Sequence, residues 1–319
     1  MTTTTTLNYD VDRYYRHTGR APIVGTTIAT VVAWVAVSLI GVAYAHVQLH
    51  VKVYDIVSFL FVAAFAAAMA FTVYGVLRWA KVRNMAVTAL VAIFAGLLGW
   101  YVSWVAWEHA LLRQGGVQAS MVRLAEHPNV VWHLAQSINE EGTFSIRSRA
   151  VKGTELWVAW VIEALAFIGA TIALPILKLR DMAFCESCGR WCLRRNDVLR
   201  VALGDEAALR QQLEAKDFSY LRTGEPTNPD APHWRADLYR CPGCPDTHLL
   251  TISRVTISYY NNQRQEKATK VIDRLWVDAA QAAEVRDASQ AWEGVLRTNT
   301  GAAEPQSDVQ NEAGPGQVS

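Results

Sequence analysis

Five cysteines fall in the last part of the chain, and four of them form two closely spaced pairs. Cys185 and Cys188 enclose Glu-Ser, and Cys241 and Cys244 enclose Pro-Gly. Two such pairs supply four thiolates, which is the ligand set that holds a tetrahedral zinc ion in a zinc ribbon. The spacing therefore predicts a structural zinc site formed by all four residues.

Two other chemistries use the same residue types. Four thiolates also bind iron in a rubredoxin-like centre, and a single Cys-x-x-Cys pair can act in thioredoxin-like redox exchange, although that needs a βαβ context that the sequence lacks. Cys192 follows the first pair by four residues. It is interpreted as a free or packed thiol, with an alternative ligand or a redox-sensitive reserve as the other interpretation.

Glu163 is the single charge in the apolar run from Leu156 to Leu177. A carboxylate inside a bilayer must be protonated, paired or facing a wet cavity, because burying it charged costs several kcal/mol. Glu163 is therefore a candidate proton or ligand site. The favoured interpretation is structural, with a hydrogen bond to a neighbouring helix, for example through Ser103 or Tyr101.

Several apolar runs long enough to cross a bilayer precede the cysteines. The chain is 51% hydrophobic with a mean hydropathy of +0.10, and its long apolar runs all lie before residue 178. About 20 residues of helix cross a bilayer. The sequence predicts a cytoplasmic N-terminal lead over residues 1–21 and a four-helix membrane domain over 22–178, with spans at about 22–45, 56–77, 85–107 and 156–177.

Lysine and arginine near the spans predict the orientation. Arg78, Lys81 and Arg83 form a basic loop between the second and third spans, and a further basic cluster follows the fourth. Both sites are expected in the cytoplasm, together with both termini, which makes residues 108–154 an extracytoplasmic loop.

The remainder is expected to be a small α+β domain of the zinc-ribbon type over residues 179–297. The separation of the two cysteine pairs is longer than usual for a ribbon, so residues 193–238 are interpreted as a helical insertion. Strand-like runs at 248–260 and 267–277 predict a hairpin, and 278–296 a helix. Residues 298–319 lack periodicity and are expected to be a disordered tail.

Several short segments between the second span and the cysteines carry a resemblance. They are Tyr101-Val-Ser-Trp104, His127-Pro-Asn with Trp132 and Ile138, Gly142-Thr-Phe-Ser, Gly153-Thr-x-Leu and Trp160-x-x-Glu163-Ala. Over roughly residues 50 to 250 the chain resembles a group of uncharacterised bacterial multi-span membrane proteins with a cytoplasmic cysteine-bearing domain. The resemblance implies four spans in a bacterial plasma (inner) membrane and carries over no activity.

The net charge of the chain is +1, and residues 178–298 hold 18 basic against 17 acidic side chains. A nucleic-acid surface needs a net basic face, so no nucleic-acid partner is expected. The cluster Arg190, Arg194, Arg195 and Arg200 is assigned to anionic lipid headgroups instead.

The favoured function is a membrane protein whose zinc ribbon is a cytoplasmic interaction or regulatory module without catalysis, because no Gly-rich phosphate loop, nucleophile elbow or His-Glu-x-x-His motif occurs. Its partners would be the lipid bilayer and a cytoplasmic protein or further copies of the chain. The alternatives are a small oligomeric transporter or proton-coupled component that uses Glu163, and a redox-active cysteine protein.

Overall fold

The computed structural model describes residues 13–50, 56–142, 144–146, 149–225, 227 and 230–301. The chain divides into two compact units. We call residues Arg16–Trp191 the helical unit, and residues Met1–Tyr15 together with Cys192–Ser319 the sheet unit.

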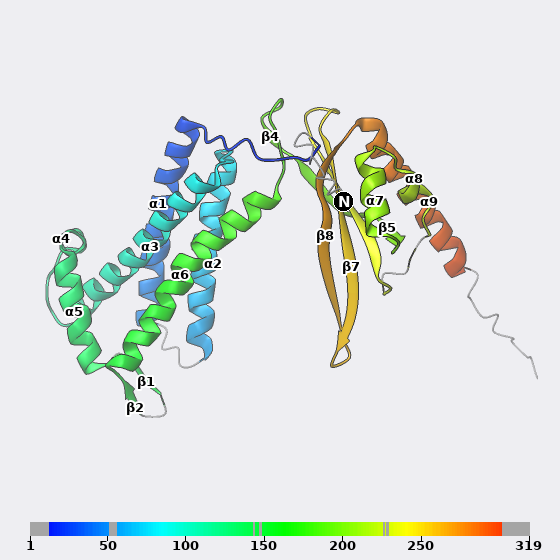
Figure 1. Ribbon diagram of the computed structural model, residues 1–319. Coiled ribbons are helices and arrows are strands. Elements are labelled where there is room, and N and C mark those ends of the chain that lie inside the picture. The colour runs from blue at the N-terminus through cyan, green and yellow to red at the C-terminus, as the bar shows by residue number, and fades with distance from the viewer. Residues whose placement is uncertain are drawn as a thin grey trace, which may run out of the picture. The chain divides into compact units, whose positions relative to one another are not determined.

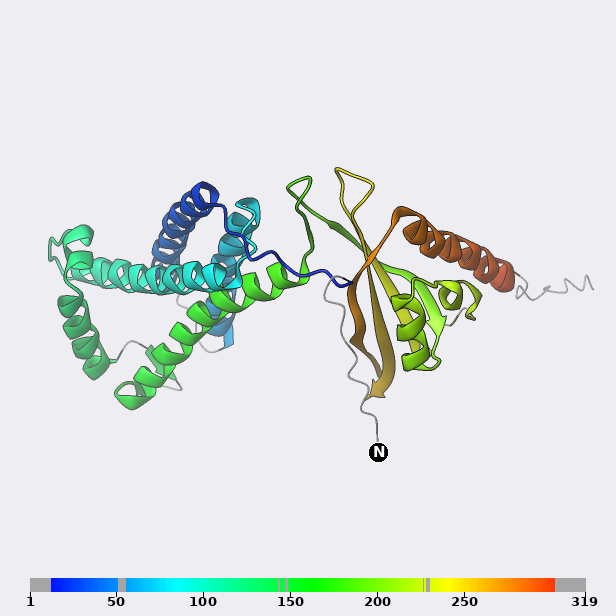
Figure 2. The same cartoon turned by 45° about the horizontal axis from the view of Figure 1, so that its top comes forward.

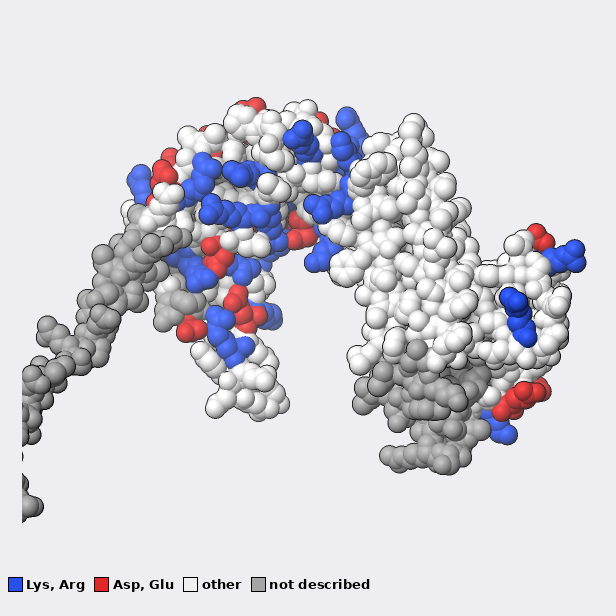
Figure 3. Space-filling view, turned by 180° about the vertical axis from the view of Figure 1, so that it is seen from behind, with Lys and Arg blue, Asp and Glu red and all other residues white. Residues whose placement is uncertain are grey.

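Four helices of the helical unit are long and apolar enough to cross a membrane. On the face seen in Figure 3, the described surface along these helices shows no charged side chains. Each helix continues past the C-terminal end of its predicted span. Their bounds are α1 (Ile23–His50), α2 (Ile56–Trp79), α3 (Met85–Gln114) and α6 (Thr154–Asp181), as labelled in Figure 1.

Glycine allows the long helices to approach closely. A Cβ atom on Gly41 of α1 would lie 2.6 Å from the carbonyl oxygen of Gly99 in α3. A Cβ atom on Gly96 would lie 3.1 Å from the Cα atom of Ile168 in α6. Helices in lipid associate through such close contacts, because lipid tails provide no hydrophobic driving force between them. Helix α3 is therefore packed against both α1 and α6.

The segment between α3 and α6 folds into short elements. Helices α4 (Met121–Glu126) and α5 (Pro128–Glu141) are followed by an antiparallel pair, β1 (Phe144–Ile146) and β2 (Arg149–Val151). Proline at the first position of α5 needs no hydrogen-bond partner for its nitrogen. Val131 and Ala135 are buried on one face of α5, so this helix is amphipathic.

The sheet unit contains one antiparallel sheet with strand order β5-β6-β7-β8. Asn261 and Asn262 join β7 to β8 with φ angles of 50° and 59°. These angles are those of a two-residue type I′ hairpin turn, which asparagine tolerates better than most residues. The strands are β5 (Leu193–Ala202), β6 (His233–Arg240), β7 (His248–Tyr260) and β8 (Gln263–Val277).

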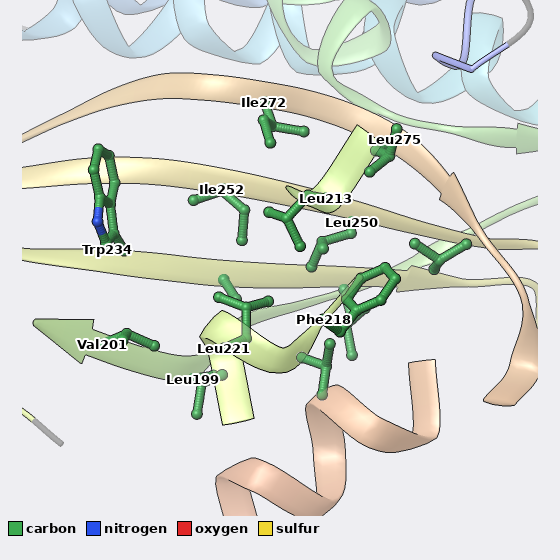
Figure 4. Packing of buried hydrophobic residues seen from close by; sticks show 14 of the residues in the cluster. Leu199, Val201, Leu213, Phe218, Leu221, Trp234, Leu250, Ile252, Ile272 and Leu275 are labelled. Atoms are coloured by element: carbon green, nitrogen blue, oxygen red, sulfur yellow. The ribbon is translucent and has the colours of Figure 1, made fainter. Parts of the chain in front are cut away.

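Three helices cover one face of this sheet, as Figures 1 and 2 both show. They are α7 (Glu206–Glu214), α8 (Ser219–Thr223) and α9 (Ala279–Gly301). Side chains alternate between the two faces of a strand, and Trp234, Ala236 and Leu238 of β6 all point to the helix-covered face. There they join one hydrophobic core, seen in Figure 4, with residues such as Leu213 and Phe218 from the helical segments.

Three boundary expectations differ from the structure. The interval 193–238 is not mainly helical, because its two ends are the strands β5 and β6 and only α7 and α8 lie between them. Helix α9 continues to Gly301, past the expected start of the tail, and residues 302–319 lie outside the described residues. The N-terminal lead is not a separate segment where it is described, since Tyr14 forms an antiparallel bridge with Leu275 of β8 and belongs to the sheet unit.

Candidate metal centre

The first cysteine pair lies in a small antiparallel hairpin of the helical unit. Strand β3 (Phe184–Cys185) pairs with β4 (Arg190–Trp191), so that Cys185 lies opposite Arg190. Gly189 follows Cys188 with a φ of 61°, a left-handed conformation that glycine adopts without steric cost. We call Phe184–Trp191 the first knuckle.

The first knuckle is attached to the loop that joins α2 to α3. Arg83 is 6% exposed, its Nε lies 3.0 Å from a carboxylate oxygen of Glu186, and its guanidinium lies 4.1 Å from the ring centroid of Phe184. The indole Nε1 of Trp191 donates to the carbonyl oxygen of Arg78 at 2.8 Å. An ion pair, a cation–π contact and a hydrogen bond therefore hold this hairpin against the end of α2 and the loop that follows it.

The segment before α1 takes part in the same network. The Thr18 hydroxyl donates to Glu186 at 2.8 Å, and the backbone N–H of Arg83 donates to the carbonyl of Arg20 at 2.9 Å. The guanidinium of Arg83 also donates to the carbonyl of Lys81 at 2.8 Å. Arg83 thus organises three chain segments, a role that the sequence did not indicate beyond a basic loop.

The second cysteine pair lies in the connection between β6 and β7. Those strands end in the pair Arg240 and His248, and the backbone N–H of Cys241 donates to the carbonyl of Thr247 at 3.0 Å. The N–H of Gly243 points at the sulfur of Cys241, 3.3 Å away. Such N–H···S contacts stabilise thiolates, which is the form of cysteine that binds metals.

The four sulfur atoms of Cys185, Cys188, Cys241 and Cys244 all lie within 4.8 Å of one another. A tetrahedral zinc ion with Zn–S bonds of about 2.3 Å would place its ligand sulfurs about 3.8 Å apart. The four side chains therefore need only a small inward shift to become ligands. None of the described cysteines is in a disulfide, so these four thiols form a site that could hold a metal ion.

Cys192 does not join this group. The cluster found among the described residues consists of the two predicted pairs alone, and Cys192 is buried next to the start of β5. Its position agrees with the interpretation as a packed thiol.

Glu163 has a different partner from those expected. It accepts a hydrogen bond from the hydroxyl of Tyr44 in α1, and the same hydroxyl accepts one from Nε2 of Gln48 at 2.6 Å. The hydroxyls of Tyr101 and Ser103 donate instead to the carbonyls of Ala125 and Trp100. The hydroxyl next to Glu163 therefore comes from α1 and not from α3.

Glu108 is a buried acid that the sequence did not single out. It is 1% exposed, and neither carboxylate oxygen has a hydrogen-bond partner among the described residues. The predicted third span ended at Trp107, but α3 continues to Gln114 and carries Glu108 into the protein interior.

Of the four arginines that were assigned to lipid headgroups, Arg190 lies in the first knuckle and the other three lie in β5 of the sheet unit. Arg200 forms an ion pair with Asp197, and Arg194 forms one of 2.7 Å with the fully buried Asp237. Two of the four charges are therefore used inside the unit. Arg195 lines a hollow that is described below.

Comparisons of the chain with protein-family models, with curated proteins and with solved structures give no match. The fold and the cysteine cluster are thus the observations from which a function can be argued.

Proposed function

We propose that this chain is an integral membrane protein in which the four cysteines hold a structural zinc ion and the sheet unit is a non-catalytic interaction or regulatory module. The cluster of four sulfurs within 4.8 Å carries the proposal. Four thiolates are the ligands of closed structural zinc sites, which keep no open position for a substrate.

The setting of the first knuckle supports this role. Its ion pair with Arg83 and the hydrogen bond from Trp191 hold Cys185 and Cys188 close to the ends of α2 and α3. We propose that these ends face the cytoplasm of a bacterial cell, as the basic loop indicates. Cytoplasmic thiols stay reduced, a condition that favours metal binding over a disulfide.

The hairpin turn of β7 and β8 supports a protein partner. Tyr259 and Tyr260 directly precede the turn, and they are 64% and 67% exposed. Tyrosine is enriched at protein interfaces, because it combines a large apolar ring with a polar hydroxyl. The partner we propose is a cytoplasmic protein or another copy of this chain, and not a nucleic acid.

Metal content tests the first half of the proposal. Full-length protein purified in detergent is expected to contain one zinc per chain, and Cys241→Ser to lose it together with thermal stability. Cys192→Ser is the matched control, since this thiol lies outside the cluster, and it should keep the metal. Iron, or no metal together with a reversible disulfide, would replace this proposal with redox chemistry.

Cross-linking tests the second half. A photo-reactive amino acid in place of Tyr260 should give a discrete cross-linked species in membranes, whereas the same substitution of the exposed Arg222 should not. A species that contains only this chain would identify a homo-oligomer. Equal cross-linking from both positions would show that the hairpin turn is not the docking surface.

A second candidate function is proton-coupled transport through Glu163. The series Gln48, Tyr44 and Glu163 connects α1 to α6 inside otherwise apolar helices. An ionisable side chain within a membrane-spanning helix costs free energy, and such residues commonly serve ion or proton pathways. Glu163→Gln keeps the shape and the acceptor but cannot exchange a proton. A loss of proton flux in reconstituted vesicles would favour transport, and unchanged flux would exclude it.

A further inference from the structure

The sheet unit has a hollow of about 280 Å³ on the helix-covered face of the sheet, at the end where β6 and β7 approach the second cysteine pair. Its apolar lining consists of Leu193, Leu238 and Ala282. The polar lining contains only basic side chains, namely Arg194, Arg195, Arg240, His248 and Arg286.

Strand pairing explains why these residues meet. Leu193 lies opposite Arg240, Arg240 lies opposite His248, and Arg195 lies opposite Leu238. Residues directly opposite each other in a sheet project from the same face, and so do residues two apart on one strand. The face that α9 covers therefore carries the side chains of Leu193, Arg195, Leu238, Arg240 and His248. Ala282 and Arg286 of α9 complete the lining.

The positive charge in this hollow is largely uncompensated. Arg194 is held by its ion pair with Asp237. Among the described residues, no carboxylate forms an ion pair with Arg195, Arg240 or Arg286, and no aspartate or glutamate lines the hollow. A cleft lined by one sign of charge attracts ligands of the opposite sign.

His248 provides an independent indication of a ligand. It is 8% exposed, and its Nδ1 atom is buried without a hydrogen-bond partner among the described residues. A buried polar atom of this kind is costly unless something absent from the protein chain satisfies it. Burial and, to a smaller extent, the nearby Arg286 and Arg240 lower the pKa of His248, while Asp246 and Asp278 act in the opposite direction.

We propose that this hollow binds a small phosphate-bearing anion, with Arg195, Arg240 and Arg286 on the phosphate oxygens and His248 completing the contacts. The guanidinium fork matches phosphate geometry with two parallel hydrogen bonds. A phosphate group carries about −1.5 to −2 charges at pH 7. It therefore balances the charge of three arginines better than a ligand with a single carboxylate would. The apolar lining accommodates an organic part of the ligand next to the phosphate.

The volume limits the ligand to a small molecule or a single lipid headgroup. Pockets for small molecules range from about 300 to 1,000 Å³, and this hollow lies near the lower limit. The ligand is thus a soluble phosphate ester or diphosphate, or the phosphate of one lipid, and the two sources can be distinguished by experiment. This site does not depend on the metal proposed above.

Binding is measured by calorimetry on full-length protein in detergent, at constant ionic strength, with two probes. Pyrophosphate represents a soluble ligand, and dihexanoyl phosphatidic acid represents a lipid headgroup. We expect at least one probe to bind, and Arg286→Gln to weaken it by about tenfold or more because a charge-assisted contact is lost. Preference for the short-chain lipid would identify the lipid source.

Two further variants separate binding from folding. Arg254→Gln is the matched control, because Arg254 pairs with Glu206 away from the hollow, and it should bind as the wild type does. Arg286→Lys keeps the charge without the planar fork and should bind with intermediate affinity. Absence of binding by both probes, or equal affinity in the wild type and both glutamine variants, would overturn the proposal.

Discussion

Removal of the Arg83 guanidinium gives the most informative test of the attachment of the first knuckle. Arg83→Gln breaks the 3.0 Å ion pair with Glu186 and the cation–π contact with Phe184. We expect the first knuckle to come loose from the loop between α2 and α3, and any metal held by Cys185 and Cys188 to be released faster.

The size of the effect follows from the contacts. A hydrogen bond to a charged group contributes about 1.5–3 kcal/mol, and the lower end applies because the Glu186 side chain is 33% exposed. A cation–π contact adds about 0.5–1 kcal/mol at such a site. Arg83→Gln should therefore destabilise the first knuckle by about 2–3 kcal/mol, equivalent to metal release faster by roughly thirtyfold or more.

The assay is the rate at which full-length protein in detergent transfers its metal to a chromogenic chelator. Arg78→Gln is the matched control: Arg78 is exposed and contributes only its backbone carbonyl to Trp191, so the same charge is removed without loss of the contact. Glu186→Gln combined with Arg83→Gln should be less than additive. Equal release rates for the two arginine variants would refute the reasoning.

The helix packing yields two more predictions, each measured by thermal unfolding in detergent. Gly41→Ala should destabilise the helical unit by about 1–3 kcal/mol, because the added Cβ would lie 2.6 Å from the Gly99 carbonyl oxygen. Gly75→Ala is the control: its Cβ meets nothing within 4 Å, so this variant should be neutral or stabilising. Equal losses of stability in the two variants would argue against close α1–α3 packing. Tyr44→Phe removes the hydroxyl next to Glu163 and should lower the free energy of unfolding by about 0.5–2 kcal/mol. An unchanged midpoint of thermal unfolding would mean that this hydroxyl contributes nothing to the association of α1 with α6.

The cysteine cluster was predictable because each of its two pairs can be recognised from a segment of four residues. Each pair is spaced for a tight turn, and four thiolates have few other uses in a reducing compartment. The apolar helices were predictable for the same reason, since about 20 apolar residues suffice to identify a span. In both cases the chemistry of a short segment decides the outcome.

Features that depend on distant segments were not predictable. The sequence LRRNDVLRVA of β5 looks like a charged surface run, and only Leu199 and Val201 reach the core once β6 is beside it. Likewise, nothing in α6 indicates that Tyr44 is the residue that meets Glu163. The order of helices in a bundle depends on packing such as the Gly41–Gly99 contact, which the hydrophobic pattern does not encode.

The pairing of the N-terminal residues with β8 affects when and how the sheet unit can be completed. Tyr15 donates its N–H to the carbonyl of Arg274, and the N–H of Trp276 donates to the carbonyl of Arg13. The ribosome synthesises residues 13–15 long before β8, so this pairing can form only after β8 has been made. A fragment that starts after α6 would never acquire residues 13–15 and would expose the outer edge of β8 to pairing between molecules. An affinity tag fused close to Arg13 would disturb the same edge.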